Sequence, residues 1–165
     1  DGSVVTWGNP DYGGDSSRVQ HVLKNVQQIS STHHAFAATL ADGSVVTWGD
    51  QDFGGDSSTV QHLLKNVQQI CGTEAAFAAI LADGSVVTWG DTEGGGDSSR
   101  VQDMLREVRQ ICTTDRSFAA ILADGTVVTW GDPHCGGDSS RVQGQLRNVQ
   151  QISGIQTMVV TAPES

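Results

Sequence analysis

The chain has 165 residues, of which 9 are Lys or Arg and 19 are Asp or Glu, so its formal net charge at pH 7 is −10. Negative charge repels phosphate backbones and anionic lipid headgroups, so we expect neither nucleic-acid binding nor direct membrane insertion. A protein with a basic surface is a compatible partner. The three cysteines are an odd number without a C-x-x-C pair, which argues against a disulfide framework or a zinc site.

One sequence motif is repeated four times. The motif Asp-Gly-Ser-Val-Val-Thr-Trp-Gly begins, at a spacing of 41 residues, at Asp1, Asp42, Asp83 and, with Thr in place of Ser, Asp124. A fixed period of about 20 to 50 residues indicates a repeat protein, in which units that cannot bury their own apolar faces stack on their neighbours. We therefore expect a single repeat domain, 1–165, with the repeats 1–41, 42–82, 83–123 and 124–165.

In the second repeat, a Gly-rich loop at 49–55 follows Trp48. Ser58 followed three residues later by Gln61 has the form of a capping box, which predicts a short helix of about two turns ending at Lys65 and the asparagine after it. The segment 67–71 then alternates apolar and polar residues, which is typical of a strand.

Two further strands are predicted at 75–82 and 85–90, on either side of Asp83-Gly84. Asp-Gly between two β-prone runs favours a tight primed hairpin turn with positive φ at both central residues. The glycines of these turns are therefore expected to be structural residues, and they are Gly43, Gly84 and Gly125. Three strands and a short helix per repeat predict an all-β fold with short helices.

The two ends of the chain complement each other. In the last repeat Val159 occupies the position that phenylalanine holds in the others, and Pro163 ends the segment. The segment 157–161 could pair with 3–7, which would close the array into a ring and remove its exposed edges. Because the sequence begins inside a motif and without Met, we expect a processed product or an excerpt of a longer array; whether the array closes is left open.

The pattern Asp-Gly-x-Val-x-x-Trp-Gly-Asp/Asn, followed by a Gly-rich stretch and the next Phe-Ala-Ala-Ile-Leu strand, resembles the regulator-of-chromosome-condensation repeat family. The likeness covers every repeat and implies a β-propeller that acts through protein contacts, as in guanine-nucleotide exchange, docking within HERC-type ubiquitin ligases and plant UV-B sensing. These units are shorter than the family's blades, and four are present where the family normally builds seven. No residue specific to exchange can be matched, so an exchange or ubiquitin-ligase-associated role is a distant alternative.

The tryptophans are expected to pack, because each stands in the Trp-Gly position of the motif. The Gly-Trp-Arg-His-Thr motif associated with the UV-B receptors does not occur. The residues assigned this structural role are Trp7, Trp48, Trp89 and Trp130.

Acidic residues follow each Trp-Gly pair and raise a second alternative. Asp50, Asp52 and Asp56 stand at spacings typical of calcium loops, so a calcium-stabilised or ligand-binding module is possible in principle. The other copies carry Asn9, Glu93 or His134 in this loop and lack a distal bidentate Glu, which favours turn and helix-capping roles. We assign no metal and no cofactor.

Nothing in the sequence predicts catalysis. His33 and His34 are adjacent and cannot share one face of a strand, and no Ser, His and Asp set has the spacing of a nucleophile with its base. The copies differ mainly at loop tips, which either drift freely or are tuned to a partner. The candidate contact residues are Tyr12, His33, His34, Phe53, Glu74, Asp115, Arg116 and His134.

These observations predict a non-enzymatic protein–protein interaction scaffold, acting as a module or subunit of something larger. No run is long enough to cross a bilayer, so we expect a soluble protein, intracellular rather than secreted. The sequence indicates neither the compartment nor the oligomeric state.

Overall fold

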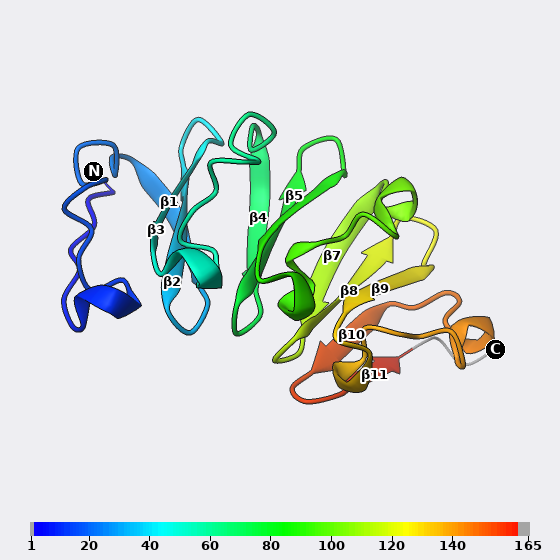
Figure 1. The fold of residues 1–165 in the computed structure, drawn as a ribbon. Helices are drawn as coiled ribbons and strands as arrows, with labels where there is room; N and C mark the ends of the chain where they lie inside the picture. Colours follow the sequence, from blue (N-terminus) through cyan, green and yellow to red (C-terminus); the bar gives the residue numbers. More distant parts are fainter. Residues whose placement is uncertain (1, 162–165) are drawn as a thin grey trace.

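The computed structural model describes residues 2–161, and within them four small antiparallel sheets stand side by side along a curved array (Figure 1). The first three sheets have three strands each, and the fourth has two. In chain order the strands are β1 (Val26–Ser31), β2 (Ala35–Leu40), β3 (Val45–Gly49), β4 (Val67–Gly72), β5 (Ala76–Leu81), β6 (Val86–Gly90), β7 (Val108–Thr113), β8 (Ser117–Leu122), β9 (Val127–Gly131), β10 (Gln151–Gly154) and β11 (Met158–Thr161). The expected all-β, propeller-like array is confirmed.

The hairpin turn between the second and third strands of each sheet differs from the predicted primed turn. In the first sheet, the Gly43 N–H donates to the Leu40 carbonyl at 2.9 Å, and Gly43 takes a φ of +78° while Asp42 does not take a positive φ. This is a type I turn followed by a left-handed glycine, the three-residue hairpin that carries a G1 bulge. Glycine is also required sterically, since a Cβ there would lie 2.8 Å from the Cα of Asn66.

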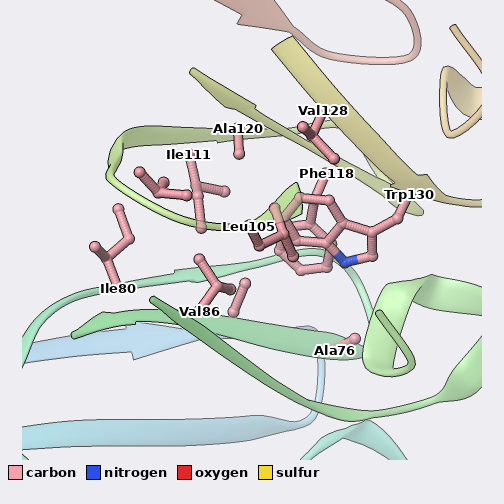
Figure 2. Close-up of a cluster of buried hydrophobic side chains, with 11 residues drawn as sticks. Ala76, Ile80, Val86, Leu105, Ile111, Phe118, Ala120, Val128 and Trp130 are labelled. Atoms are coloured by element: carbon pink, nitrogen blue, oxygen red, sulfur yellow. The ribbon is translucent and has the colours of Figure 1, made fainter. Parts of the chain in front are cut away.

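Each sheet presents different side chains to its two neighbours. The second sheet turns Phe77 and Trp89 toward the first sheet, and turns Ala76, Ile80 and Val86 toward the third. Figure 2 shows the second of these interfaces, where small and branched side chains of β5 and β6 meet the aromatic rings of the third sheet. The labelled members of that cluster are Ala76, Ile80, Val86, Leu105, Ile111, Phe118, Ala120, Val128 and Trp130.

Three of the four tryptophans join one repeat to the one before it. Trp48, Trp89 and Trp130 are at most 5% exposed, and each indole stacks on the phenylalanine of its own sheet at 5.1–5.3 Å. Each Nε1–H donates to a glycine carbonyl of the preceding repeat, at 3.0–3.1 Å. Trp7 differs from the predicted packing role, because its side chain is 84% exposed.

The predicted two-turn helix is wrong. After Asp56 the second repeat forms only turns, and the third and fourth repeats add single 3₁₀ turns, η4 (Gln102–Met104) and η6 (Gln143–Gln145). The other short helical turns all follow a Trp-Gly pair: η1 (Pro10–Tyr12), η2 (Gln51–Phe53), η3 (Thr92–Gly96) and η5 (Pro133–Cys135).

A side-chain relay replaces the predicted capping box. Ser57, not Ser58, is the residue engaged: its hydroxyl lies 3.0 Å from the Thr47 hydroxyl and donates to Gln61 Oε1 at 2.7 Å. Gln61 Nε2 then donates to the Val45 carbonyl at 2.9 Å, on the outer edge of β3. Because the glutamine is committed to the sheet edge, it cannot reach back to a helix start.

The last sheet is shifted by one residue relative to the others. Gly154 pairs with Met158 and Ile152 with Val160, so Met158 lies over Gly136 as a phenylalanine lies over the equivalent glycine in the other repeats. Val159, which spacing alone placed in the phenylalanine position, is 61% exposed instead.

The predicted pairing of the two termini is also not found. Residues 3–7 form no strand, and β11 pairs with β10. The described ends of the chain lie at opposite ends of the curved array (Figure 1). Asp1 and Pro163 lie outside the described residues.

The first strands of successive sheets lie next to one another. The Ser30 hydroxyl donates to the Ile70 carbonyl at 2.8 Å, and the Cys71 thiol makes the same contact one repeat later, with the Ile111 carbonyl at 3.6 Å. Cys71 and Cys112, which are one repeat apart, are both partly buried. Among residues 2–161 no helix is both long and apolar enough to span a membrane.

Candidate functional site: a rim of loops at one end of the sheets

Two kinds of loop meet at one end of every three-stranded sheet. In the first sheet Ala35, at the start of β2, pairs with Gly49, at the end of β3, so the loop before Ala35 and the segment after Gly49 are neighbours. The Thr32 hydroxyl joins them by donating to the Phe53 carbonyl at 2.9 Å. We call this end of the array the loop rim.

All eight candidate contact residues predicted from the sequence lie on the loop rim. They come from the loop between the first and second strands of a sheet, or from the turn after a Trp-Gly pair. The structure thus places them along one side of the array, at the same end of each sheet, although their role in binding stays a prediction. They are Tyr12, His33, His34, Phe53, Glu74, Asp115, Arg116 and His134.

An aromatic stack occupies the N-terminal part of the rim. The rings of Tyr12 and His34 are nearly parallel, with centroids 4.1 Å apart, and Phe53 meets the other side of His34 at 4.1 Å and 45°. Tyr12 is 50% exposed, while His34 and Phe53 are half-buried. Tyr12 reaches His34 from the turn after the preceding Trp-Gly pair, and Phe53 reaches it from the turn after β3 of the same sheet, so the two rings contact His34 from different turns.

Backbone hydrogen bonds join the loop tips of neighbouring sheets. The N–H of His33 donates to the carbonyl of Glu74 at 2.9 Å, and the N–H of Glu74 donates to the carbonyl of Asp115 at 2.8 Å. The N–H of Asp115 donates in turn to Ile155 at 3.1 Å. These bonds fix the spacing of the tips, so their side chains form a surface with a set geometry.

Arg116 lies at the centre of an acidic cluster farther along the rim. Its guanidinium reaches Glu74 and Glu93 at 3.3 Å, and Asp132 and Asp91 at 3.8 and 3.9 Å. The Arg116 side chain is 34% exposed and Glu93 is 84% exposed, so water screens these ion pairs and each adds at most about 1 kcal/mol to stability. Four carboxylates around one guanidinium leave a local excess of three negative charges.

The sequence analysis missed three members of this cluster as partners of Arg116. Glu93 was considered only as part of a possible calcium loop, and Asp91 and Asp132 were not singled out. A signal was present, however: Arg116 stands two repeats after His34, so it must lie between two of the post-tryptophan turns as His34 does. If the neighbours of one repeat had been transferred to the next by the 41-residue period, the contact of Arg116 with these turns would have been predicted.

The aspartates of the post-tryptophan turns act as caps. Asp50 Oδ1 accepts the backbone N–H of Asp52 at 2.9 Å, and Asp132 Oδ1 accepts that of His134 at 2.8 Å. His134 itself is exposed. Within residues 2–161, no three His, Cys, Asp or Glu side chains come together in a way that could hold a metal ion.

The rim therefore combines two kinds of surface. The half-exposed aromatic stack offers flat apolar area, and the acidic cluster offers uncompensated negative charge. Ala75 and Gly94, both buried, occupy the equivalent positions in the repeat between them.

Comparisons with known proteins identify the fold. No protein-family model and no curated protein sequence matches the chain. Among solved structures, it is similar to Prp20p from Saccharomyces cerevisiae, with a TM-score of 0.60, 13% identity, and coverage of 96% of this chain and 51% of that one. It is also similar to a structure of Kap60 bound to yeast RCC1 (Prp20), with a TM-score of 0.58, 16% identity, and coverage of 83% and 41%.

A third similar structure is the CRINKLY WD40 ectodomain of the Arabidopsis thaliana receptor kinase ACR4, with a TM-score of 0.53, 14% identity, and coverage of 84% and 46%. The chain thus spans about half or less of the length of the structures it matches. At these identities the likeness concerns the fold alone. The chain has an RCC1-like β-propeller fold of consecutive small sheets.

Proposed function

We propose that this chain is a non-enzymatic scaffold of RCC-type repeats that binds a basic surface of another protein through its loop rim. The observation that carries the proposal is that the aromatic stack and the acidic cluster lie on the same rim, where a lysine or arginine of a partner can use both apolar area and negative charge. The proposal includes the predicted role as a module or subunit of a larger protein or assembly, in the single repeat domain 1–165.

Three further observations support it. The net charge of −10 favours a partner of opposite sign, and the backbone bonds between loop tips hold the rim in one arrangement before binding, which lowers the entropy lost on association. One of the structures of this fold is described together with the binding of Prp20p to Gsp1p and histones. The calcium alternative has no comparable support, because the loop aspartates accept backbone N–H groups.

The test reverses the charges of the rim. A variant that combines Glu74→Lys and Asp115→Lys, which makes the rim four charges more positive, should bind a Lys- and Arg-rich peptide at least tenfold more weakly in fluorescence anisotropy. Its melting temperature should stay nearly unchanged, because the exchanged side chains are exposed or half-exposed. Partners isolated on the immobilised chain and identified by mass spectrometry should be lost from the same variant.

The matched control makes the same change of four charges away from the rim, at two exposed acidic residues: Asp103→Lys and Glu107→Lys. This control should bind the peptide as the native chain does. Equal affinity of the rim variant and the native chain would remove the loop rim as the binding surface.

A further inference from the structure

A groove runs along the outer edge of β9, from the loop rim to the opposite end of the third sheet. Its described lining residues all lie within 92–143, and β9 lies between two segments that form the walls, 92–104 and 132–143. Its volume is about 1270 Å³, larger than the roughly 300–1,000 Å³ typical of small-ligand pockets. The size therefore suits a stretch of polypeptide better than a small molecule.

The two ends of the groove differ in chemistry. At the rim end, the lining includes the carboxylates of Glu93 and Asp132, which surround Arg116. At the other end, beside the turn between β8 and β9, the lining includes Met104 and Leu122. Met104 is 52% exposed, so the groove ends on an apolar surface that the chain itself leaves in contact with water.

Negative charge extends from the rim into the groove. Asp97 and Asp138 line it at equivalent positions of successive repeats, and Arg100 is the one lysine or arginine among its described lining residues. The lining therefore carries four carboxylates against one guanidinium. Hydrogen bonds from the backbone of Ser99 and Ser140 lower the pKa of the two aspartates, so both stay ionised at neutral pH. Charge of this sign complements lysine and arginine.

The relay described for β3 also occupies part of the β9 edge. Gln143 Nε2 donates to the Val127 carbonyl at 3.1 Å, so this carbonyl is not free to pair with another strand. We therefore expect recognition in the groove to depend on side chains more than on the addition of a β-strand.

We propose that the groove binds an extended segment of the partner protein, with lysine or arginine toward the rim and a large apolar side chain on Met104 and Leu122. The inference rests on the proposed function, because the groove shares Glu93 and Asp132 with the acidic cluster of the rim. The five residues of β9 separate the two ends by about 16 Å, so the basic and apolar residues of the segment are about five positions apart.

Fluorescence anisotropy with two matched peptides tests the apolar contact. One peptide has a central run of lysine and arginine with a leucine about five residues to either side, and the other has serine in place of both leucines. The native chain should bind the leucine peptide about fivefold more tightly, and Met104→Ser should abolish this preference. The matched control is Leu63→Ser, at the same position of the second repeat and 47% exposed, which should keep the preference.

Charge reversal tests the walls of the groove. Asp97→Lys combined with Asp138→Lys should weaken the binding of both peptides about tenfold. The control combines Asp15→Lys with Asp56→Lys, at the same positions of the first two repeats, and should weaken binding much less. Each of the four aspartates accepts the backbone N–H of the residue two positions later, so the two variants lose the same caps and should show equal melting temperatures.

The outcomes separate this inference from the proposed function. Equal affinity of the native chain for the two peptides would overturn the groove as the docking site and leave the rim as a site for basic peptides. Loss of the leucine preference in the Leu63 variant, or equal weakening by the two charge variants, would also overturn it, because the peptide would then bind outside the groove. Failure of both peptides to bind the native chain would overturn both proposals.

Discussion

Thr39 is a buried residue whose hydroxyl is not satisfied. It lies on the face of β2 that packs against the second sheet, where later repeats carry Ile80 and Ile121. The residue is 6% exposed and Oγ1 has no hydrogen-bond partner in the described part of the chain. A depression beside it, about 390 Å³ in volume and lined by Gln28, Asn66 and their neighbours, leaves room for a larger side chain.

We expect Thr39→Ile to stabilise the fold by about 1–2 kcal/mol, because it removes an unpaired buried hydroxyl and adds the apolar contacts that Ile80 makes one repeat later. Urea denaturation would measure this as a higher midpoint with an unchanged slope. Thr39→Ser keeps the hydroxyl and should show no gain. A lower midpoint for the isoleucine variant would mean that the space beside β2 cannot hold the extra methyl group.

Cys71 makes stability depend on alkaline pH. Burial raises the pKa of its thiol from 9.0 to about 11, and the nearby Cys112 adds to the effect, while a hydrogen bond from Gln69 opposes it. The folded state therefore keeps the proton between about pH 9 and 11, where the unfolded chain has lost it. Stability is fully present below pH 9, falls as the pH rises through this window, and levels off above it, by at most about 3 kcal/mol.

We expect Cys71→Ser to flatten this alkaline decline. Serine stands at the equivalent place in the first repeat, where the Ser30 hydroxyl donates to the Ile70 carbonyl, so the contact with Ile111 can be kept. Melting temperatures at pH 8 and pH 11 compare the two chains. If the melting temperatures of the two chains fell equally between pH 8 and pH 11, another titrating group would be responsible for the loss of stability at alkaline pH.

At the scale of single elements, the third strand of each three-stranded sheet is an edge that the chain covers with its own side chains. The relay through threonine, serine and glutamine recurs in all four repeats: it ends on a valine carbonyl of β3, β6 and β9, and in the first repeat on the Val4 carbonyl. An open edge invites pairing with other chains, so the relay limits aggregation as well as holding the loop.

Gln61→Ala should break this relay at β3. We expect a loss of about 1–2 kcal/mol in the free energy of unfolding, because the Val45 carbonyl loses its donor, together with faster aggregation measured by light scattering. Gln51→Ala, at an exposed position of the same repeat, is the control. Unchanged light scattering in Gln61→Ala would show that the edge of β3 is protected in another way.

The regular strands were predictable because their pattern is local. The segments 67–71, 75–82 and 85–90 were predicted, and the structure has β4 (Val67–Gly72), β5 (Ala76–Leu81) and β6 (Val86–Gly90). Two β-prone runs separated by Asp-Gly leave few alternatives to a hairpin. The exact turn type was not predictable from that dipeptide, because Asp-Gly fits both the primed turn and the longer bulged one.

The errors arose where the outcome depends on distant contacts. Ser57 and Ser58 are both consistent with a cap, and the choice is made by Thr47, ten residues earlier, on the edge of β3. The pairing of β10 with β11 is shifted by one residue, which places Met158, not Val159, over Gly136. The candidate contact residues were chosen as loop tips, and their role in binding stays a prediction; the neighbours of Arg116 could not be predicted without knowing which turns meet.

At the scale of the whole molecule, stability is shared between neighbouring sheets. Truncation before Thr157 should destabilise the chain, because the cut removes β11 from its pairing with β10. It also removes Met158 and Val160 from a cluster that contains Leu146 and Ile152.

We expect the truncated chain to melt lower and to lose hydrogen-exchange protection mainly in β10 and the adjacent sheet, while β4–β6 stay protected, since each unit contacts only its neighbours. Exchange measured by mass spectrometry on the two chains distinguishes this from global loosening. Uniform loss of protection would contradict nearest-neighbour coupling.

The indole-to-carbonyl bond that ties Trp48 to Gly13, Trp89 to Gly54 and Trp130 to Gly95 has a consequence for how such an array can change in size. Every junction uses the same hydrogen bond at the same interval, so duplicating or deleting exactly one 41-residue unit would leave all remaining junctions intact. The number of repeats can therefore change without loss of these bonds. An insertion or deletion of any other length within a unit would disrupt them.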